Sequence, residues 1–219
     1  MSFKGAIFDL DGVVVNTVPL HFKAWKRMFS GYGKDFTFQD YKEKVDGIPR
    51  FDGAKAILTG LSGEEIEEAA AKKQNYYREL VDMGEIDVYQ STVELIKELK
   101  ADNIDIAAAS SSKNCRYILE KSGLIGYFDV VIGGGDFKKG KPDPEIFLLA
   151  ASRLGFSPQD SVVFEDAKLG VLAAKNGKML CVGIARDGDK KLLEKADIIV
   201  GDLKEINYEK LKGLFKDEK

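Results

Sequence analysis

Two acids one residue apart, Asp9 and Asp11, follow the apolar run Ala6-Ile7-Phe8 near the start of the chain. An unpaired carboxylate is expensive to remove from water, so a buried run should not end in two of them without compensation. The pair therefore predicts either a strand end that faces water or a positively charged partner.

Three more segments carry similar chemistry. The sequence Ser110-Ser111-Ser112-Lys113-Asn114 follows a second apolar run, Glu165-Asp166 follows another, and a loop carries Lys141-Pro142-Asp143-Pro144. In a parallel sheet these strand ends lie on one edge. Carboxylate oxygens suit Mg²⁺, whereas hydroxyls, a lysine and the N–H groups of a helix start suit phosphate oxygens. Taken together, the segments predict a site for Mg²⁺ and a phosphoryl group.

The apolar runs alternate with helical patterns, which is typical of a parallel sheet with both faces covered. The expected fold is α/β, with a doubly wound, Rossmann-like parallel sheet. The expected strands are Gly5 to Phe8, Ile104 to Ala109, Val130 to Ile132, Val162 to Phe164, Leu180 to Val182 and Ile198 to Val200. The expected helices are Thr92 to Lys100, Cys115 to Ser122, Pro144 to Arg153, Lys168 to Asn176 and Lys190 to Lys195.

Residues 17–87 break this alternation, because they contain no convincing strand. Two amphipathic helical stretches, "HFKAWKRMF" and "SGEEIEEAAAKKQNYYRELV", are joined through turns that contain Gly and Pro. We therefore expect a core domain of residues 1–16 and 88–219 and a helical cap domain of residues 17–87. Such an insertion would sit over the carboxyl ends of the sheet, where open α/β sheets bind ligands.

The composition limits the other classes of function. The chain has 219 residues, is 44% hydrophobic and 32% charged, and carries a formal charge of −3, which disfavours a general nucleic-acid partner. No apolar stretch is long enough for a membrane span, and the first residues do not have the pattern of a signal peptide. The two cysteines, Cys115 and Cys181, do not form a disulfide framework. We expect a cytoplasmic monomer with no membrane or nucleic-acid partner.

Four segments resemble, in order, the four motifs of the haloacid dehalogenase superfamily of phosphotransferases. They are "FDLDGVVVNT", "AAASSSKN", "KKGKPDPEIF" and "VVFEDAKLG". The resemblance covers the whole chain, since the insertion after the first motif is similar to the helical cap of this superfamily. Dehalogenating members lack the second acid of the first motif; Asp11 is present, so the resemblance implies phosphoryl transfer.

The resemblance also implies a role for each matching residue. Asp9 would be the nucleophile that becomes an aspartyl phosphate, and Asp11 the general acid and base. Ser110 and Lys141 would bind the transferring phosphoryl group. The residues implied to hold Mg²⁺ are Asp9, Asp11 through its backbone carbonyl, and Asp166, with Glu165 close by in the outer shell.

Within the superfamily, the insertion is most similar to the phosphoglucomutases. The segments that carry this similarity are "TVPLHFKAWKRM", "VDGIPR" and "KKQNYY". The resemblance implies a sugar phosphate as substrate, with β-glucose 1-phosphate converted to glucose 6-phosphate. The implied substrate-binding residues are Thr17, His21, Trp25, Gly47, Arg50 and Lys73 in the insertion and Ser111, Ser112, Lys113 and Asn114 in the core.

Two positions depart from the mutase pattern: Pro49 and Gly53 stand where polar residues are usual, and Pro49 also lacks a backbone N–H. The departures keep a second interpretation open, a sugar-phosphate phosphatase gated by its cap. A phosphonate hydrolase of the superfamily is disfavoured, because its Schiff-base lysine is not evident in the insertion. A non-catalytic binding protein on the same fold would have no need of a nucleophile such as Asp9.

Overall fold

The computed structural model describes residues 2–45, 48–186, 188 and 190–215. The chain divides into two compact units, and each is described by itself. Unit 1 consists of Met1–Asn16 and Asp87–Lys219, and unit 2 of Thr17–Ile86. The boundary between the insertion and the returning chain thus falls one residue earlier than the sequence pattern predicts.

Unit 1 is built on a parallel sheet, as the apolar runs predict. Among its described residues, six strands lie in the order β5-β4-β1-β6-β7-β8, and every neighbouring pair is parallel. Their bounds are β1 Gly5–Phe8, β4 Asp105–Ala109, β5 Val130–Ile132, β6 Ser161–Glu165, β7 Leu180–Ile184 and β8 Ile198–Val200. This confirms the doubly wound α/β fold.

The order of the strands puts a topological switch point at β1. The chain passes from β1 to β4 and β5 on one side and then crosses to β6, β7 and β8 on the other. Phe8 is in register with Ala108 on β4 and with Phe164 on β6, so these three strands end at the same level. Open α/β sheets bind ligands in the crevice at such a point.

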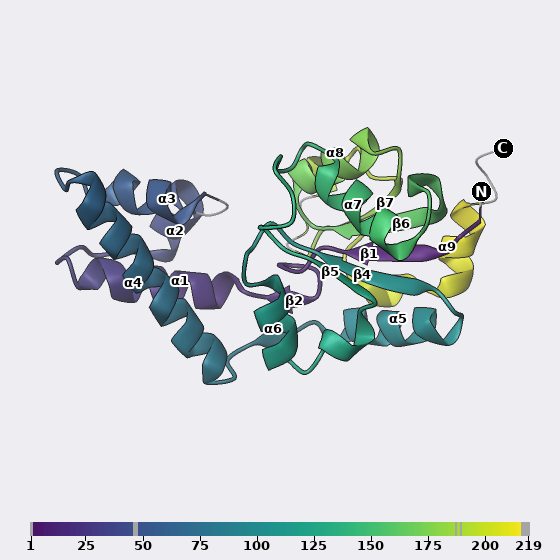
Figure 1. The fold of residues 1–219 in the computed structure, drawn as a ribbon, viewed down its shortest axis with the longest axis horizontal. Helices are drawn as coiled ribbons and strands as arrows, with labels where there is room; N and C mark the ends of the chain where they lie inside the picture. Colours follow the sequence, from purple (N-terminus) through teal and green to yellow (C-terminus); the bar gives the residue numbers. More distant parts are fainter. Residues whose placement is uncertain (1, 46–47, 187, 189, 216–219) are drawn as a thin grey trace. The chain divides into compact units, whose positions relative to one another are not determined.

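Helices cover both faces of this sheet (Figure 1). Ile7, Ala107 and Val163 point to one face and belong to a buried cluster with apolar residues of α7 (Glu145–Leu154) and α8 (Lys168–Asn176). Helices α5 (Gln90–Ala101) and α9 (Tyr208–Leu214) lie on the opposite face. Because both faces are covered, the interior positions of the central strands are apolar, and polar residues stand only at strand ends, at Asp105, Ser161 and Glu165.

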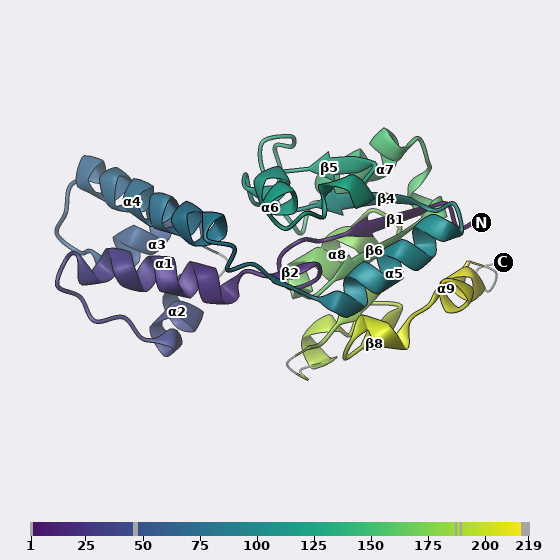
Figure 2. The same ribbon diagram turned by 90° about the horizontal axis from the view of Figure 1, so that it is seen from below.

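Unit 2 consists of helices in its described part: α1 (Val18–Ser30), α2 (Phe38–Lys44), α3 (Arg50–Ile57) and α4 (Gly63–Asp82). Helices α1 and α4 lie side by side (Figure 2). The start of α4 is set by a capping box, in which Ser62 Oγ accepts from the Glu65 amide at 3.3 Å and Glu65 accepts from the Ser62 amide at 2.7 Å. Trp25 and Phe29 on α1 form the centre of the apolar core of this unit.

One expectation about secondary structure was wrong, and one pair of short strands was not anticipated. The described part of residues 17–86 contains helices and no strand, as expected, but Asp87–Val88 at its border forms β3, which pairs antiparallel with β2 at Val15–Asn16. A pair of two-residue strands is too short to leave a hydrophobic period. The expected helix from Lys190 to Lys195 is a 3₁₀ turn at Lys190–Leu193, because Leu193 is its one buried residue and a short segment needs a packed apolar face to stay helical.

The remaining described elements of unit 1 are short segments between the strands and helices named above. They are α6 (Cys115–Lys121) and the 3₁₀ turns at Ile125–Tyr127, Pro158–Asp160 and Leu203–Glu205.

We predict that Phe29→Ala destabilises unit 2 by about 3–5 kcal/mol, because it leaves a cavity in the core of that unit. Phe29 is fully buried, and its ring lies 5.2 Å from that of Trp25 and 4.7 Å from that of Phe36. Trp25 is the one tryptophan of the chain, so its fluorescence during urea unfolding reports on this unit. Phe38→Ala is the control, because Phe38 is 48% exposed. Equal losses in the two variants would contradict the prediction.

Candidate active site

A largely buried lysine, 12% exposed, lies between two carboxylates at the carboxyl ends of β1 and β6. Lys141 Nζ is 2.5 Å from Asp9 Oδ1 and also contacts Glu165 Oε1. Asp9 directly follows β1, Glu165 is the last residue of β6, and Lys141 comes from the loop between β5 and α7. The second oxygen of Glu165 accepts from the Ala167 amide at 2.7 Å. The structure therefore brings these three predicted site residues together.

The charges of this cluster are strongly coupled. Burial raises the pKa of Asp9 well above its usual value, Lys141 opposes this effect, and the neighbouring acids Glu165, Asp11 and Asp166 reinforce it. Burial by itself would lower the pKa of Lys141, but Asp9 and Glu165 together raise it. Burial and the charge of Glu165 raise the pKa of Asp166 to about 7. The site therefore holds more acids than Lys141 can neutralise, which favours a further cation.

The loop after β1 brings Asp11 and Asp166 into the same region. Gly12 has a φ of +84°, and a Cβ atom at this position would lie 1.8 Å from Asp166 Oδ2. The carboxylate of Asp166 thus rests directly on the backbone that follows Asp11, in space that any other residue would fill. Asp11 Oδ2 accepts a hydrogen bond from Ser110 Oγ at 3.1 Å.

This arrangement fits a hard divalent cation. In the described part of the chain, no three His, Cys, Asp or Glu side chains already surround a single point. Mg²⁺ does not need three, because it usually keeps several waters and takes one or two carboxylates from the protein. Asp9, Asp166 and the backbone carbonyl of Asp11 form such a set of oxygen donors, and the excess negative charge around Lys141 has the right sign.

The serine-rich loop after β4 forms a compact turn. Ser110 is buried, and its Oγ accepts from the Ser112 amide at 3.0 Å; Ser112 Oγ in turn accepts from the Asn114 amide at 3.1 Å. Ser111 and Lys113 are exposed. Ser110 is thus fixed next to Asp11, whereas the four predicted substrate-binding residues of this loop occupy its outer part.

In unit 2, three of the predicted residues form one group, in which Lys73 and Trp25 are buried and His21 is partly buried. Lys73 Nζ lies 2.8 Å from His21 Nδ1 and 5.1 Å from the centre of the Trp25 ring. An ammonium has no acceptor, so Lys73 donates and the proton of the neutral imidazole sits on Nε2. The His21 ring also stacks on Tyr77 at 4.3 Å. Burial, followed by the charge of Lys73, lowers the pKa of His21 well below its usual value, which keeps it neutral.

The other predicted residues of unit 2 have different surroundings. Arg50 is exposed at the first position of α3, and Thr17 is buried just before α1. Gly47 lies outside the described residues. The departure at Gly53 has a packing explanation: a Cβ there would lie 3.1 Å from ring atoms of Trp25.

Three residues that shape the site were not predicted. A Cβ at Gly134 would lie 2.1 Å from the Ser111 carbonyl oxygen, and one at Gly170 would lie 1.7 Å from Glu165 Oε1. The run Gly133-Gly134-Gly135 after a strand and the glycine within "EDAKLG" are sequence signals for such close approaches. Arg186, which bonds to the backbone after Asp11, gives no comparable signal in the sequence.

Comparison with known proteins gives one consistent result. A family model described as haloacid dehalogenase-like hydrolase matches residues 3–178. The chain is 34% identical to a β-phosphoglucomutase of Bacillus subtilis, over 95% of this chain and 93% of the relative. It is 33% identical to a phosphorylated carbohydrates phosphatase of Thermotoga maritima, over 93% and 99% of the two chains. The crystal structure of a β-phosphoglucomutase from Clostridium difficile superposes with a TM-score of 0.84 at 31% identity, covering 98% of each chain.

The chain therefore belongs to the haloacid dehalogenase-like hydrolase family, as its four motifs indicate, and it is an enzyme of the mutase or phosphatase kind. In the part of the chain that the structure describes, no helix combines the length and the apolar composition needed to cross a bilayer.

We predict that His21 makes unit 2 less stable in acid. The unfolded chain takes up a proton on this histidine near pH 6.5, whereas the folded chain excludes it, so the free energy of unfolding falls as the pH drops below about 6.5. The slope approaches about 1.4 kcal/mol per pH unit until the lowered folded pKa is reached. Urea unfolding at several pH values, followed through Trp25, measures this slope.

His21→Gln is the matched variant, and because the chain has a single histidine, no other imidazole contributes to the difference. The variant should lose stability less steeply than the wild type between about pH 6.5 and pH 5. Parallel curves for the two proteins would show that His21 is not held neutral in the folded state.

Proposed function

We propose that this protein transfers phosphoryl groups through a covalent intermediate on Asp9, with Mg²⁺ as cofactor. The observation that carries the proposal is the buried contact of Lys141 with both Asp9 and Glu165 at the switch point of the sheet. Beside it, Ser110 bonds to the carboxylate of Asp11. A nucleophile, a proton-transfer group, a fixed cation and a hydroxyl thus converge where the fold binds ligands.

In the first step, a carboxylate oxygen of Asp9 attacks phosphorus and the ester oxygen of the substrate leaves. Asp11 gives its proton to that oxygen, so the product leaves as a neutral alcohol. In the second step, Asp11 takes a proton from the acceptor hydroxyl, which attacks the phosphorus of the Asp9 phosphate and frees the carboxylate. Lys141 and Ser110 bind the phosphoryl oxygens, and catalysis is mainly positioning and electrostatics.

Asp9, Asp166 and the carbonyl of Asp11 are the proposed ligands of Mg²⁺, with Glu165 just outside them. The ion, when bound, would supply positive charge against the phosphoryl oxygens. Glu165 holds Lys141 beside this position, and Gly12 leaves room for Asp166 to reach it.

For the acceptor, we propose the hydroxyl of a sugar phosphate, so that the protein acts as a β-phosphoglucomutase. Relatives over nearly the whole chain carry that name. A mutase needs a second phosphate site. Arg50 is exposed on the helical unit, and its guanidinium has several N–H donors that can bind a phosphate. The buried pair of Lys73 and His21 would then connect the closing of the cap with proton transfer at Asp11. The exposed Ser111 and Lys113, with Ser112 and Asn114, would contact the sugar phosphate from the core.

A phosphatase is the second candidate, because the relative from Thermotoga maritima is a phosphatase of phosphorylated carbohydrates at nearly the same identity. In that case water is the acceptor, and the core site alone is sufficient. Monomeric state and cytoplasmic location stay predictions.

We predict that Asp9→Asn reduces turnover of p-nitrophenyl phosphate to background without unfolding the protein, because an amide cannot form the phosphoenzyme. Beryllium fluoride with Mg²⁺ should give protein-bound ¹⁹F resonances in the wild type and none in the variant, and a chelator should abolish both turnover and resonances. The control is Asp102→Asn, since Asp102 is exposed at the end of α5. Turnover by Asp9→Asn in a preparation free of other phosphatases would refute the nucleophile.

We predict that Arg50→Ala slows the conversion of β-glucose 1-phosphate to glucose 6-phosphate by about tenfold to hundredfold. This is the loss expected for one charge-assisted contact of about 1.5–3 kcal/mol. Hydrolysis of p-nitrophenyl phosphate, which needs only the core site, should change little. The reaction is primed with glucose 1,6-bisphosphate, and both glucose 6-phosphate and inorganic phosphate are measured.

Arg78→Ala is the matched control, because Arg78 is also an exposed arginine of the helical unit. If the wild-type protein releases inorganic phosphate from sugar phosphates much faster than it isomerises them, the phosphatase is the correct assignment and the mutase is not.

A further inference from the structure

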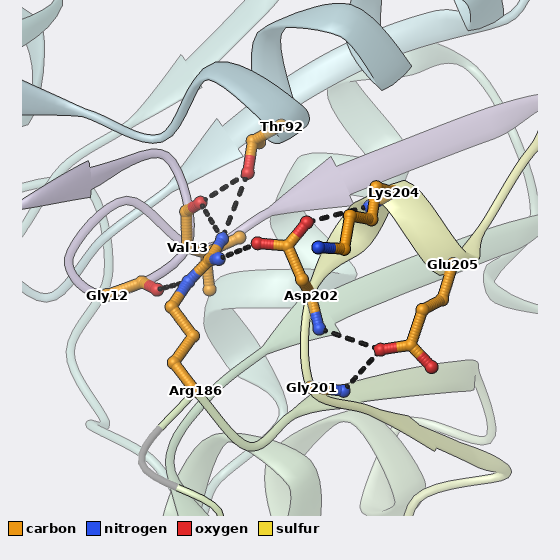
Figure 3. Close-up of polar contacts among 8 residues, drawn as sticks. All are labelled: Gly12, Val13, Thr92, Arg186, Gly201, Asp202, Lys204 and Glu205. Carbon is orange, nitrogen blue, oxygen red and sulfur yellow. Dashed lines mark hydrogen bonds and ion pairs between the residues drawn. The ribbon is translucent and has the colours of Figure 1, made fainter.

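Arg186 follows β7 and reaches the loop that carries Asp11. Its side chain is 18% exposed, and all of the contacts described below lie within unit 1. Arg186 Nε donates to the carbonyl oxygen of Gly12 at 3.1 Å, and one of its terminal nitrogens, Nη2, donates to that of Val13 at 3.3 Å. The guanidinium thus holds two successive carbonyls directly after Asp11 (Figure 3).

The far end of Arg186 is firmly anchored. Nη1 donates to Asp202 Oδ2 at 2.8 Å. Asp202 is itself fixed, because its other oxygen accepts from the Lys204 amide at 2.9 Å and its own amide donates to Glu205 at 3.0 Å. The guanidinium also stacks 3.6 Å from the Tyr89 ring. The side chain therefore connects the loop after Asp11 to the 3₁₀ turn that begins after Asp202 (Figure 3).

A second donor reinforces the same loop. Thr92 Oγ1 donates to the Val13 carbonyl at 2.7 Å, and it accepts from Arg186 Nη2 at 3.3 Å. Thr92 is fully buried near the start of α5, so this contact is excluded from solvent.

The contacts of Arg186 and Thr92 with these two carbonyls restrain a segment whose backbone flexibility is a consequence of the glycine at position 12. Position 12 must be glycine, because the carboxylate of Asp166 occupies the space of a Cβ atom. Glycine has the largest conformational freedom of any residue, and here it directly follows Asp11. An unrestrained Gly12 would let the preceding peptide, and with it the Asp11 side chain, sample several orientations. Holding the carbonyls of Gly12 and Val13 removes that freedom.

We propose that Arg186 is a positioning residue, which fixes Asp11 for proton transfer by restraining the carbonyls of Gly12 and Val13. The inference rests on the proposed function, in which Asp11 is the general acid and base. Arginine is needed because its planar fork reaches a carboxylate, two carbonyls and a hydroxyl at once, whereas the single ammonium of a lysine cannot span them.

The experiment separates the two steps of the reaction. Nitrophenolate is a good leaving group that needs little help from an acid, so attack by Asp9 on p-nitrophenyl phosphate depends weakly on Asp11. Breakdown of the phosphoenzyme by water needs Asp11 as base. In Arg186→Lys, a rapid-mixing experiment should therefore give a burst of nitrophenolate with wild-type rate and amplitude. In the following steady state, kcat and KM should both fall by about tenfold to hundredfold, because only breakdown of the phosphoenzyme is slowed, and kcat/KM should stay unchanged.

Arg186→Gln removes the charge as well and should show the same pattern. The control is Arg153→Lys, since Arg153 forms a comparable ion pair with Asp136 at 3.3 Å. Circular dichroism and thermal unfolding are recorded for all three. The control should match the wild type in burst and in turnover.

Wild-type turnover in Arg186→Lys would overturn the proposal, and so would a proportional loss of burst and steady state, which indicates general damage to the site. Failure of both Arg186 variants to fold would show that the contacts of Arg186 serve the stability of the fold and not the positioning of Asp11. Failure of the proposed function looks different: the wild type itself would then form no phosphoenzyme on Asp9, and both proposals would fall together.

Discussion

The contact of Lys141 with Asp9 and Glu165 is the interaction on which the rest of the site depends. Two carboxylates at the ends of adjacent buried strands are tolerable only if a cation lies between them, because leaving one buried charge without its partner costs about 3–5 kcal/mol. Lys141 must therefore reach the edge of the sheet from the loop before α7, and its own charge is secured by the same acids. In the proposed reaction, a lysine fixed in this way would need little reorganisation to bind the phosphoryl oxygens.

Close approach of charged groups to the backbone is the second constraint, and it explains the glycines. Asp166 lies against Gly12, and Glu165 lies against Gly170 on α8. Each contact brings an acid nearer to the reacting position than a residue with a side chain would permit. The cost is backbone freedom. At Gly170 the helix supplies the restraint, whereas at Gly12, which lies in a loop, it comes from the 2.8 Å bond of its amide to the Val15 carbonyl and from Arg186.

In the helical unit, a buried lysine is stabilised by an imidazole and by aromatic rings instead of by carboxylates. The one histidine of this unit is partly buried, neutral and bonded to Lys73, with Tyr77 stacked on the ring. A buried lysine is costly unless other groups compensate, and here an imidazole and the faces of Trp25 and Tyr77 do so. The core would then perform the chemistry, while the helical unit selects the substrate.

The sequence by itself determined the parallel sheet and the edge that carries the candidate site. Each central strand is a short apolar run, and its end is marked by a change to polar residues, so the positions of Asp9, Ser110 and Glu165 follow from local patterns. Tertiary structure decided what local patterns do not encode. The contact of Lys141 with Asp9 joins residues 132 positions apart, and that of Arg186 with Gly12 joins residues 174 apart. The order of the strands brings such residues together, and a side chain whose partners lie far away in the sequence leaves no periodicity in its own neighbourhood.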